Sequence, residues 1–251
     1  MQTNKVGLTS KTYDVDDFAA AQEFYHSNGW TDGLPVVPPT EAAVEACLEW
    51  GLMRPDQLIG IEPVRAQPIT AEKLAINAVM AGCLPMHFPV VATAWQAMMK
   101  EEFLLHGVTS STGGCAILVI INGPIRREIG ANSTFNALAN SDRATAVIGR
   151  SLRLALINLL DVRGGGIDRT TLGHPGKFSY CLAEAGFGAS ALSRCFNGSG
   201  FFGMSCTPYK KGPARGPSPQ RQRSATHMWW WPPRFLMMTT FLLWPRWLRQ
   251  P

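Results

Sequence analysis

The chain contains no Asp or Glu after Glu184. Residues 185–251 hold nine Lys/Arg, eight Pro and five of the eight Trp. Residues 1–184 hold the other 14 basic residues and all 18 acidic ones, which gives that part a formal net charge of −4. The net charge of +5 and the pI near 9.0 therefore average an acidic portion and a basic extension. A basic pI of this origin is no evidence that the whole chain binds nucleic acid.

Long apolar runs are also missing. No stretch reaches the roughly 18–20 uninterrupted apolar residues that a membrane-spanning helix needs, so we predict no transmembrane segment. Residues 1–13 are polar and lack an apolar core, which predicts no secretory signal and a cytoplasmic protein. The phosphate-binding pattern G-x-x-x-x-G-K-[ST] and the zinc pattern H-E-x-x-H are absent as well. Nucleotide hydrolysis is therefore not expected.

The cysteines are few and widely spaced. None forms a C-x-x-C pair, which argues against a disulfide framework or a zinc finger. In a cytoplasmic chain we expect reduced thiols, most of them buried as small apolar side chains. They are Cys47, Cys83, Cys115, Cys181, Cys195 and Cys206.

Helical spacing of apolar residues, with capping residues at the ends, predicts five helices. Their expected ranges are 16–27, 41–50, 71–82, 89 to about 102, and 143 to about 160. Thr40, Thr70 and Asp142 are the expected N-caps of the second, third and fifth helices, because their side-chain oxygens can accept from backbone N–H groups.

Residues 116–121 (AILVII) form the clearest strand, and their apolar character on both faces favours a central strand covered on each side. Shorter strands are predicted at 58–61 and 178–182. Residues 30–39 contain too many prolines for a central strand and suit an edge strand or an extended loop. The pattern predicts one α/β domain over residues 1–184, with layered helices around a small, mostly buried sheet.

Residues 185–251 allow three interpretations. Arg with interleaved Trp could bind nucleic acid or an anionic membrane surface, although the prolines interrupt any continuous helix. The segment could be disordered with some binding role. It could also come from a shifted reading frame, which would produce Arg, Pro and Trp without acids or periodicity. In each case we predict no stable fold for it, and we do not expect nucleic acid as the partner.

Five segments carry a family resemblance: TDGLPVVPPT (31–40), TAEKLAINAVMAGCLPMHFPVV (70–91), INGPIRREIGANS (121–133), IGRSLRLALIN (148–158) and TLGHPGKFSYCLAE (171–184). Over about residues 28–184 the chain resembles an uncharacterised bacterial and metagenomic family. Genes of that family often neighbour those of UGSC proteins, small proteins with a selenocysteine-or-Cys-Gly-Ser-Cys motif. The resemblance implies thiol- or selenol-linked redox chemistry with such a partner. It ends at the compositional break, where family members continue with an acidic, Trp-Pro-containing stretch.

Cys83 and His87 are the candidate catalytic residues. They lie four residues apart, so they could pair as a nucleophile and its base or, alternatively, as two metal ligands. Cys83 follows the C-terminus of a predicted helix, whose dipole disfavours a thiolate, but the next helix N-terminus or His87 could reverse that balance. The alternative is a buried thiol and a His bonded to a backbone carbonyl. We predict no metal site from this pair alone.

Polar residues near predicted turns and strand ends are the candidate substrate-binding residues. Asn122 and Arg126 follow the predicted central strand, where ligands of open α/β sheets bind. Asn132 could offer its amide group for hydrogen bonds. Asp32 could act as an acid or base, or its side chain could form an Asx turn with its own backbone. Lys73 could supply a positive charge from its helix. His174 and Lys177 belong to a Gly-flanked loop that could bind an anion. The expected set is Asn122, Arg126, Asn132, Asp32, Lys73, His174 and Lys177.

These features lead to one hypothesis and one alternative. The hypothesis is an enzyme or enzyme subunit, a possible oxidoreductase component, that acts on a small polar or anionic molecule, with thiol- or selenol-linked redox chemistry alongside a UGSC-type partner. The alternative is a non-catalytic scaffold or binding subunit of that complex. The residues specify no cofactor.

Overall fold

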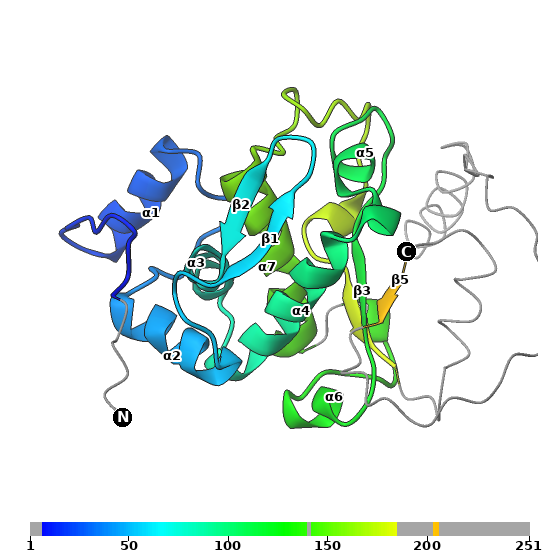
Figure 1. Ribbon diagram of the computed structural model, residues 1–251, viewed down its shortest axis with the longest axis horizontal. Helices are drawn as coiled ribbons and strands as arrows, with labels where there is room; N and C mark the ends of the chain where they lie inside the picture. The colour runs from blue at the N-terminus through cyan, green and yellow to red at the C-terminus, as the bar shows by residue number, and fades with distance from the viewer. Residues whose placement is uncertain (1–6, 140–141, 185–202, 206–251) are drawn as a thin grey trace, which may run out of the picture. The chain divides into compact units, whose positions relative to one another are not determined.

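The computed structural model describes residues 7–139 and 142–184, together with the backbone of a short strand at 203–205 (Figure 1). Groups of helices are separated by short strands in this part of the chain. The α-helices are α1 (Phe18–Ser27), α2 (Glu41–Gly51), α3 (Ala71–Ala81), α4 (Phe88–Met98), α5 (Leu105–Thr109), α6 (Ile125–Glu128) and α7 (Arg143–Leu160). The strands are β1 (Leu58–Glu62), β2 (Gln67–Thr70), β3 (Leu118–Ile121), β4 (Cys181–Ala183) and β5 (Gly203–Ser205). Short 3₁₀ turns are η1 (Pro85–His87), η2 (Glu101–Phe103), η3 (Ala137–Ala139) and η4 (Pro175–Lys177).

The helices begin where side-chain caps place them. Thr40, Thr70 and Asp142 accept hydrogen bonds from backbone N–H groups of the first turns of α2, α3 and α7, as predicted. Asp17 caps α1 in the same way, so that helix starts two residues later than expected. Helix α4 ends at Met98 rather than near residue 102, and the separate turn η2 follows it.

The described strands form two small sheets. In one sheet β3 lies between β4 and β5 and is parallel to both, which confirms it as a central strand. In the other, β1 and β2 form an antiparallel hairpin. Strand β2 and helices α5 and α6 were not predicted. Strand β5 lies beyond the compositional break, and the rest of residues 185–251 lie outside the described residues.

Strand β3 is buried on both faces. Val119 and Ile121 belong to the main apolar core, which α2, α3, α4 and α7 share, whereas Leu118 and Ile120 pack with Leu182 of β4. This two-sided burial explains why every residue of the strand is apolar. The sheet and its helices form the α/β architecture that the sequence predicts.

Helix α7 runs through the core and packs closely on its neighbours (Figure 1). Gly149 allows this approach, because a Cβ at that position would lie 2.8 Å from the backbone nitrogen of Tyr180. Within the described residues no helix is long and apolar enough to cross a membrane.

The N-terminal segment is tied to α3 by one carboxylate. Buried Glu72 accepts hydrogen bonds from the backbone N–H of Thr9 at 3.0 Å and of Ser10 at 2.7 Å, and from both hydroxyls. Lys73, a predicted substrate-binding residue, donates to the Ser10 hydroxyl at 3.0 Å. The structure thus places Lys73 in a structural contact with the N-terminal segment.

Candidate functional site

A cavity of about 590 Å³ lies between the 31–35 turn, helix α7 and the 163–178 loop. Its volume is within the range of small-molecule sites. Three of the predicted substrate-binding residues line it: Asp32, His174 and Lys177. Arg153 and Arg163, which were not predicted, line it as well. The structure therefore brings together residues that are about 140 positions apart in the sequence, and four of these five side chains are cationic or hydrogen-bond donors.

Asp32 anchors the 31–35 turn to helix α7. Its carboxylate accepts two hydrogen bonds from Arg150, from Nε at 2.9 Å and from Nη2 at 2.8 Å. The same Nη2 donates to the carbonyl of Pro35 at 2.8 Å. Burial alone would raise the pKa of Asp32, but the hydrogen bonds and positive charge of Arg150 hold that pKa below its ordinary value. Asp32 is therefore an ionised structural anchor with both oxygens engaged, and it is poorly suited to act as a base.

Arg153 lies one turn after Arg150 on the same face of α7, and it lines the cavity. Its guanidinium donates to the carbonyl of Val162 at 3.2 Å. Within the described residues, no carboxylate lies within ion-pair distance of Arg153. Burial lowers the pKa of this guanidinium, whereas the more distant carboxylates of Asp168 and Asp32 act in the opposite direction. The side chain keeps its charge, because arginine does not lose its proton in proteins.

The loop that follows α7 supplies the other cations. Lys177 donates to the Asp168 carboxylate at 2.6 Å and to the Thr170 hydroxyl at 3.0 Å. Asp168 is buried, and the hydrogen bonds from Lys177 and Thr170 outweigh that burial and lower its pKa. Arg163 pairs with Asp161 at 2.7 Å and also donates to the carbonyl of Gly29. Both cations are thus held in place by neighbouring oxygens.

His174 begins the turn η4 and faces the cavity. Its Nδ1 accepts from the backbone N–H of Gly176 at 2.9 Å, so in the neutral ring Nε2 carries the proton. Burial and the charge of Lys177 lower the pKa of His174, which favours the neutral form at pH 7. Gly176 is required here, because a Cβ would lie 2.8 Å from His174 Nδ1 and 2.8 Å from the ring of Tyr180.

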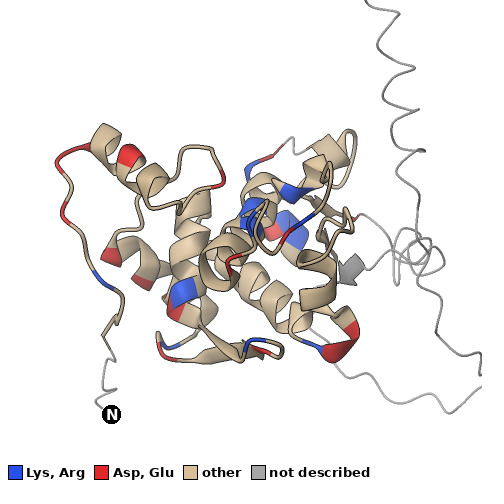
Figure 2. Cartoon of the chain, turned by 90° about the horizontal axis from the view of Figure 1, so that it is seen from above, with Lys and Arg blue, Asp and Glu red and all other residues tan. Residues whose placement is uncertain are grey.

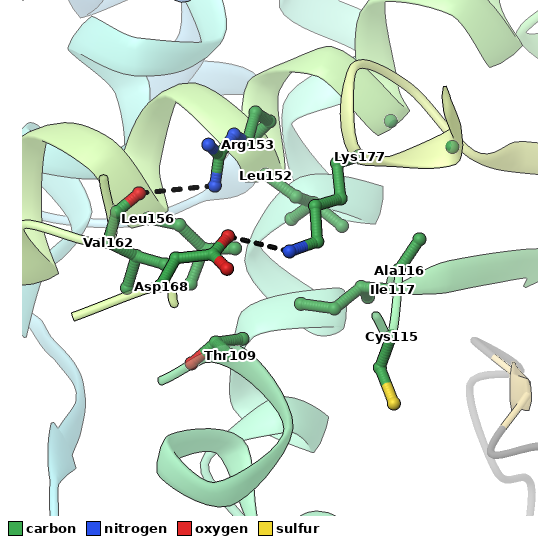
Figure 3. A pocket seen from close by; sticks show the side chains of 12 residues that line it. Thr109, Cys115, Ala116, Ile117, Leu152, Arg153, Leu156, Val162, Asp168 and Lys177 are labelled. Atoms are coloured by element: carbon green, nitrogen blue, oxygen red, sulfur yellow. Dashed lines mark hydrogen bonds and ion pairs between the residues drawn. The ribbon is translucent and has the colours of Figure 1, made fainter. Parts of the chain in front are cut away.

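A second, smaller cavity of about 30 Å³ is also lined by Arg153 and Lys177. Figure 3 shows Asp168 and Lys177 pointing toward each other beside this cavity, with Arg153 turned toward Val162. Cys115 is exposed at its edge and directs its sulfur away from the Asp168–Lys177 pair (Figure 3). The space is sufficient for a water molecule.

The predicted catalytic pair lies elsewhere, near the start of α7. Cys83 is buried and contacts the carbonyl of Val147 with Sγ at 3.6 Å. Burial raises the pKa of the Cys83 thiol far above its ordinary value, so at neutral pH the thiol is protonated and a weak nucleophile. His87 is buried as well, and its Nδ1 accepts from the backbone N–H of Leu84 at 3.1 Å. Burial lowers the pKa of His87, with a smaller contribution from Arg143.

The remaining predicted residues do not line the large cavity. Asn122 follows β3, and Arg126 on α6 donates to the carbonyl of Gly123 at 3.3 Å. Asn132 forms a local turn in which its side-chain oxygen accepts from the Thr134 N–H at 3.0 Å. Its backbone N–H donates to Asp142, the cap of α7, at 3.0 Å. The predicted site therefore divides into a loop group that forms a cavity and a strand-end group with local roles.

The sequence did not single out Arg150, Arg153, Arg163 or Asp168. A usable signal existed for the first two, since they lie three residues apart, on one face of a helix whose second half is mostly apolar. Charged side chains on so apolar a helix need partners or a cavity. Arg163 and Asp168 lie in an irregular loop, where no periodicity marks them.

Metal ligands are not assembled in this region. Across residues 7–139 and 142–184, no three His, Cys, Asp or Glu side chains gather so that they could hold a metal ion. Figure 2 shows basic and acidic residues interspersed over the described elements.

No protein-family model matches the chain, and no curated protein or solved structure is significantly similar to it.

Proposed function

We propose that this chain binds a small anionic molecule in the cavity that Arg153, Arg163, His174 and Lys177 line, and that it does so as an enzyme or enzyme subunit. The observation that carries the proposal is the placement of Arg153, a partly buried guanidinium in a cavity of about 590 Å³ with no carboxylate partner in the described part of the chain. A charge of this kind is stabilised by an anion from outside the fold.

The nature of the surrounding groups supports an anionic ligand. His174 in its neutral form offers Nε2–H, and Lys177 and Arg163 are cations. Asp32, the acidic lining residue, is already neutralised by Arg150. An anion would therefore meet donors on several sides and no unpaired carboxylate.

The alternative is a non-catalytic binding or scaffold subunit that works with a UGSC-type partner. It is favoured by the state of Cys83, because a buried, protonated thiol does not fit thiol-linked redox chemistry. Replacing Cys83 by Ser in a reconstituted pair tests the thiol-linked chemistry directly. Unchanged turnover would remove Cys83 from the chemistry, and a loss of turnover in a folded variant would restore the thiol hypothesis.

Binding itself is tested by titrating the full chain with small carboxylates and inorganic phosphate in isothermal calorimetry. We expect at least one anion to bind, and the Arg153→Met variant to bind it at least about tenfold more weakly, as the loss of a charge-assisted hydrogen bond implies. The control is Arg127→Met, on an exposed arginine of the short helix α6. No binding of any anion, or equal losses in both variants, would refute the proposal.

A further inference from the structure

The charges that line the large cavity cancel in pairs, with one exception. Asp32 pairs with Arg150 at 2.8 Å, Arg163 with Asp161 at 2.7 Å, and Lys177 with Asp168 at 2.6 Å. His174 is neutral at pH 7 for the reasons given above. Arg153 remains, and its described hydrogen bond goes to an uncharged carbonyl. The lining therefore carries one uncompensated positive charge, which a single negative charge would balance.

The cavity lining also includes apolar side chains. Ile157 of α7 and Leu172 and Phe178 of the loop contribute to its lining. Leu172 is 75% exposed and Phe178 is 55% exposed, so both leave large apolar surfaces in contact with water. A ligand that covers these surfaces gains free energy in proportion to the apolar area removed from water. A small hydrophilic anion would leave this surface exposed.

From these two observations we infer that the ligand is a monoanionic carboxylate with an apolar body, such as an aromatic or branched aliphatic acid. Its carboxylate would pair with Arg153, with the apolar body against Ile157, Leu172 and Phe178. A planar carboxylate suits the two-pronged geometry of a guanidinium. The inference rests on the proposed function, since it specifies the class of anion that the same cavity binds.

The cavity volume agrees with this ligand class. A site of about 590 Å³ has room for a ligand with a ring or a branched chain. A dianion would bring a second negative charge, and the other lining cations are already paired with carboxylates. The pair of Lys177 and the buried Asp168 is costly to separate.

The test is a set of matched probes on the full chain at pH 7.5: benzoate, acetate, benzamide and inorganic phosphate. We expect benzoate to bind at least about tenfold more tightly than acetate, because acetate lacks the apolar body. Benzamide has the same shape without the charge, and should bind at least about tenfold more weakly than benzoate. Phosphate should also bind more weakly than benzoate. Isothermal calorimetry or ligand-observed NMR measures all four.

Two variants test which residues contact the carboxylate and which contact the apolar body of the ligand. Arg153→Met should weaken benzoate and acetate by similar factors, whereas Leu172→Ser should weaken benzoate and leave acetate unchanged. Leu172 is exposed, so its replacement should not prevent folding even if Arg153→Met does. Circular dichroism confirms the fold of each variant.

The outcomes separate the inference from the proposed function. If phosphate or acetate binds as tightly as benzoate through Arg153, the apolar-carboxylate inference is overturned and anion binding stands. If Leu172→Ser leaves benzoate binding unchanged, the apolar wall plays no part and the inference also fails. If none of the anions binds, both statements are wrong.

Discussion

Two regions along helix α7 differ in what their side chains can reach. Near its start, Cys83 and His87 are buried and bonded to backbone groups. Further along, Arg153 and the 163–178 loop line a cavity of about 590 Å³. The first region contains a cysteine and a histidine, which are residue types often used in catalysis. The second region contains the cavity. Reactive side chains need access to solvent or substrate, and burial removes that access from Cys83 and His87.

The same contrast appears in the pKa values. Burial raises the pKa of the Cys83 thiol and lowers that of the His87 imidazole, so both groups favour their neutral forms. Around the cavity, by contrast, the pKa values of Asp32, which lines it, and of Asp168, the partner of Lys177, are lowered through their cationic partners, and the charges persist. The first region is a neutral packed core, and the second is a network of ion pairs beside open space.

Cysteine reactivity gives the largest expected difference between the two regions. At pH 8 iodoacetamide should alkylate exposed Cys115 at least about a hundredfold faster than buried Cys83, because the thiolate is the reacting form and must be accessible. Peptide mass spectrometry of the native protein measures both rates. In denaturant the two rates should become similar, which controls for sequence effects. Fast labelling of Cys83 in the native protein would show that the start of α7 opens. It would contradict the conclusion that this region is closed to solvent.

The ion pair of Asp32 and Arg150 should be the next largest effect. Asp32→Ala should lower the free energy of unfolding by about 3 kcal/mol, because it leaves a partly buried Arg150 without its carboxylate. Asp56→Ala is the matched control, since the Arg54–Asp56 pair is exposed and its loss should cost less than about 1 kcal/mol. Urea denaturation measures both variants. Equal losses would mean that the 31–35 turn does not depend on this pair.

The approach of the segment before β4 to α7 can be tested with one methyl group. Gly149→Ala should destabilise the fold by about 1–3 kcal/mol, because the new Cβ would overlap with Ser179 and the backbone nitrogen of Tyr180. Gly107→Ala in α5 is the control, where the nearest atom beyond the chain neighbours is 4.0 Å from the new Cβ. There the higher helix propensity of Ala should leave stability unchanged or slightly raised. A stabilising Gly149→Ala would contradict the close packing described here.

The pH dependence of anion binding should be the smallest effect. Because the pKa of His174 is lowered, the ring is neutral at pH 7.5 and gains a proton as the pH falls through that pKa. The added positive charge favours a bound anion, so benzoate affinity should rise by about threefold between pH 7.5 and pH 5.5. His174→Asn keeps an acceptor for the Gly176 N–H and should remove the rise. An affinity that falls with acidification would show that His174 does not face the ligand.

The elements of the fold were largely predictable. Capping at Thr40, Thr70 and Asp142 and the apolar run of β3 are local signals, and each appears at the expected place. Strand β2 was missed because its residues, Gln67–Thr70, are too few and too polar to show an alternating pattern. Helix α5, with five residues, was missed for the same reason of length.

The candidate site was only partly predictable. Asp32, His174 and Lys177 were selected for their residue types and flanking glycines, and the structure brings them together around one cavity. Arg153 was not selected, because the apolar sequence around it reads only as a buried helix. Its neighbours in the cavity come from the 163–178 loop, and no local pattern predicts which loop covers a helix face.

By itself, the sequence determined where helices and the central strand form, because caps and apolar periodicity act between residues a few positions apart. It also determined the acidic character of residues 1–184. Only the tertiary structure decided which polar groups are buried and which line a cavity. That outcome depends on contacts between segments far apart in the chain, such as Asp32 with Arg150, and those contacts set burial, pairing and charge state.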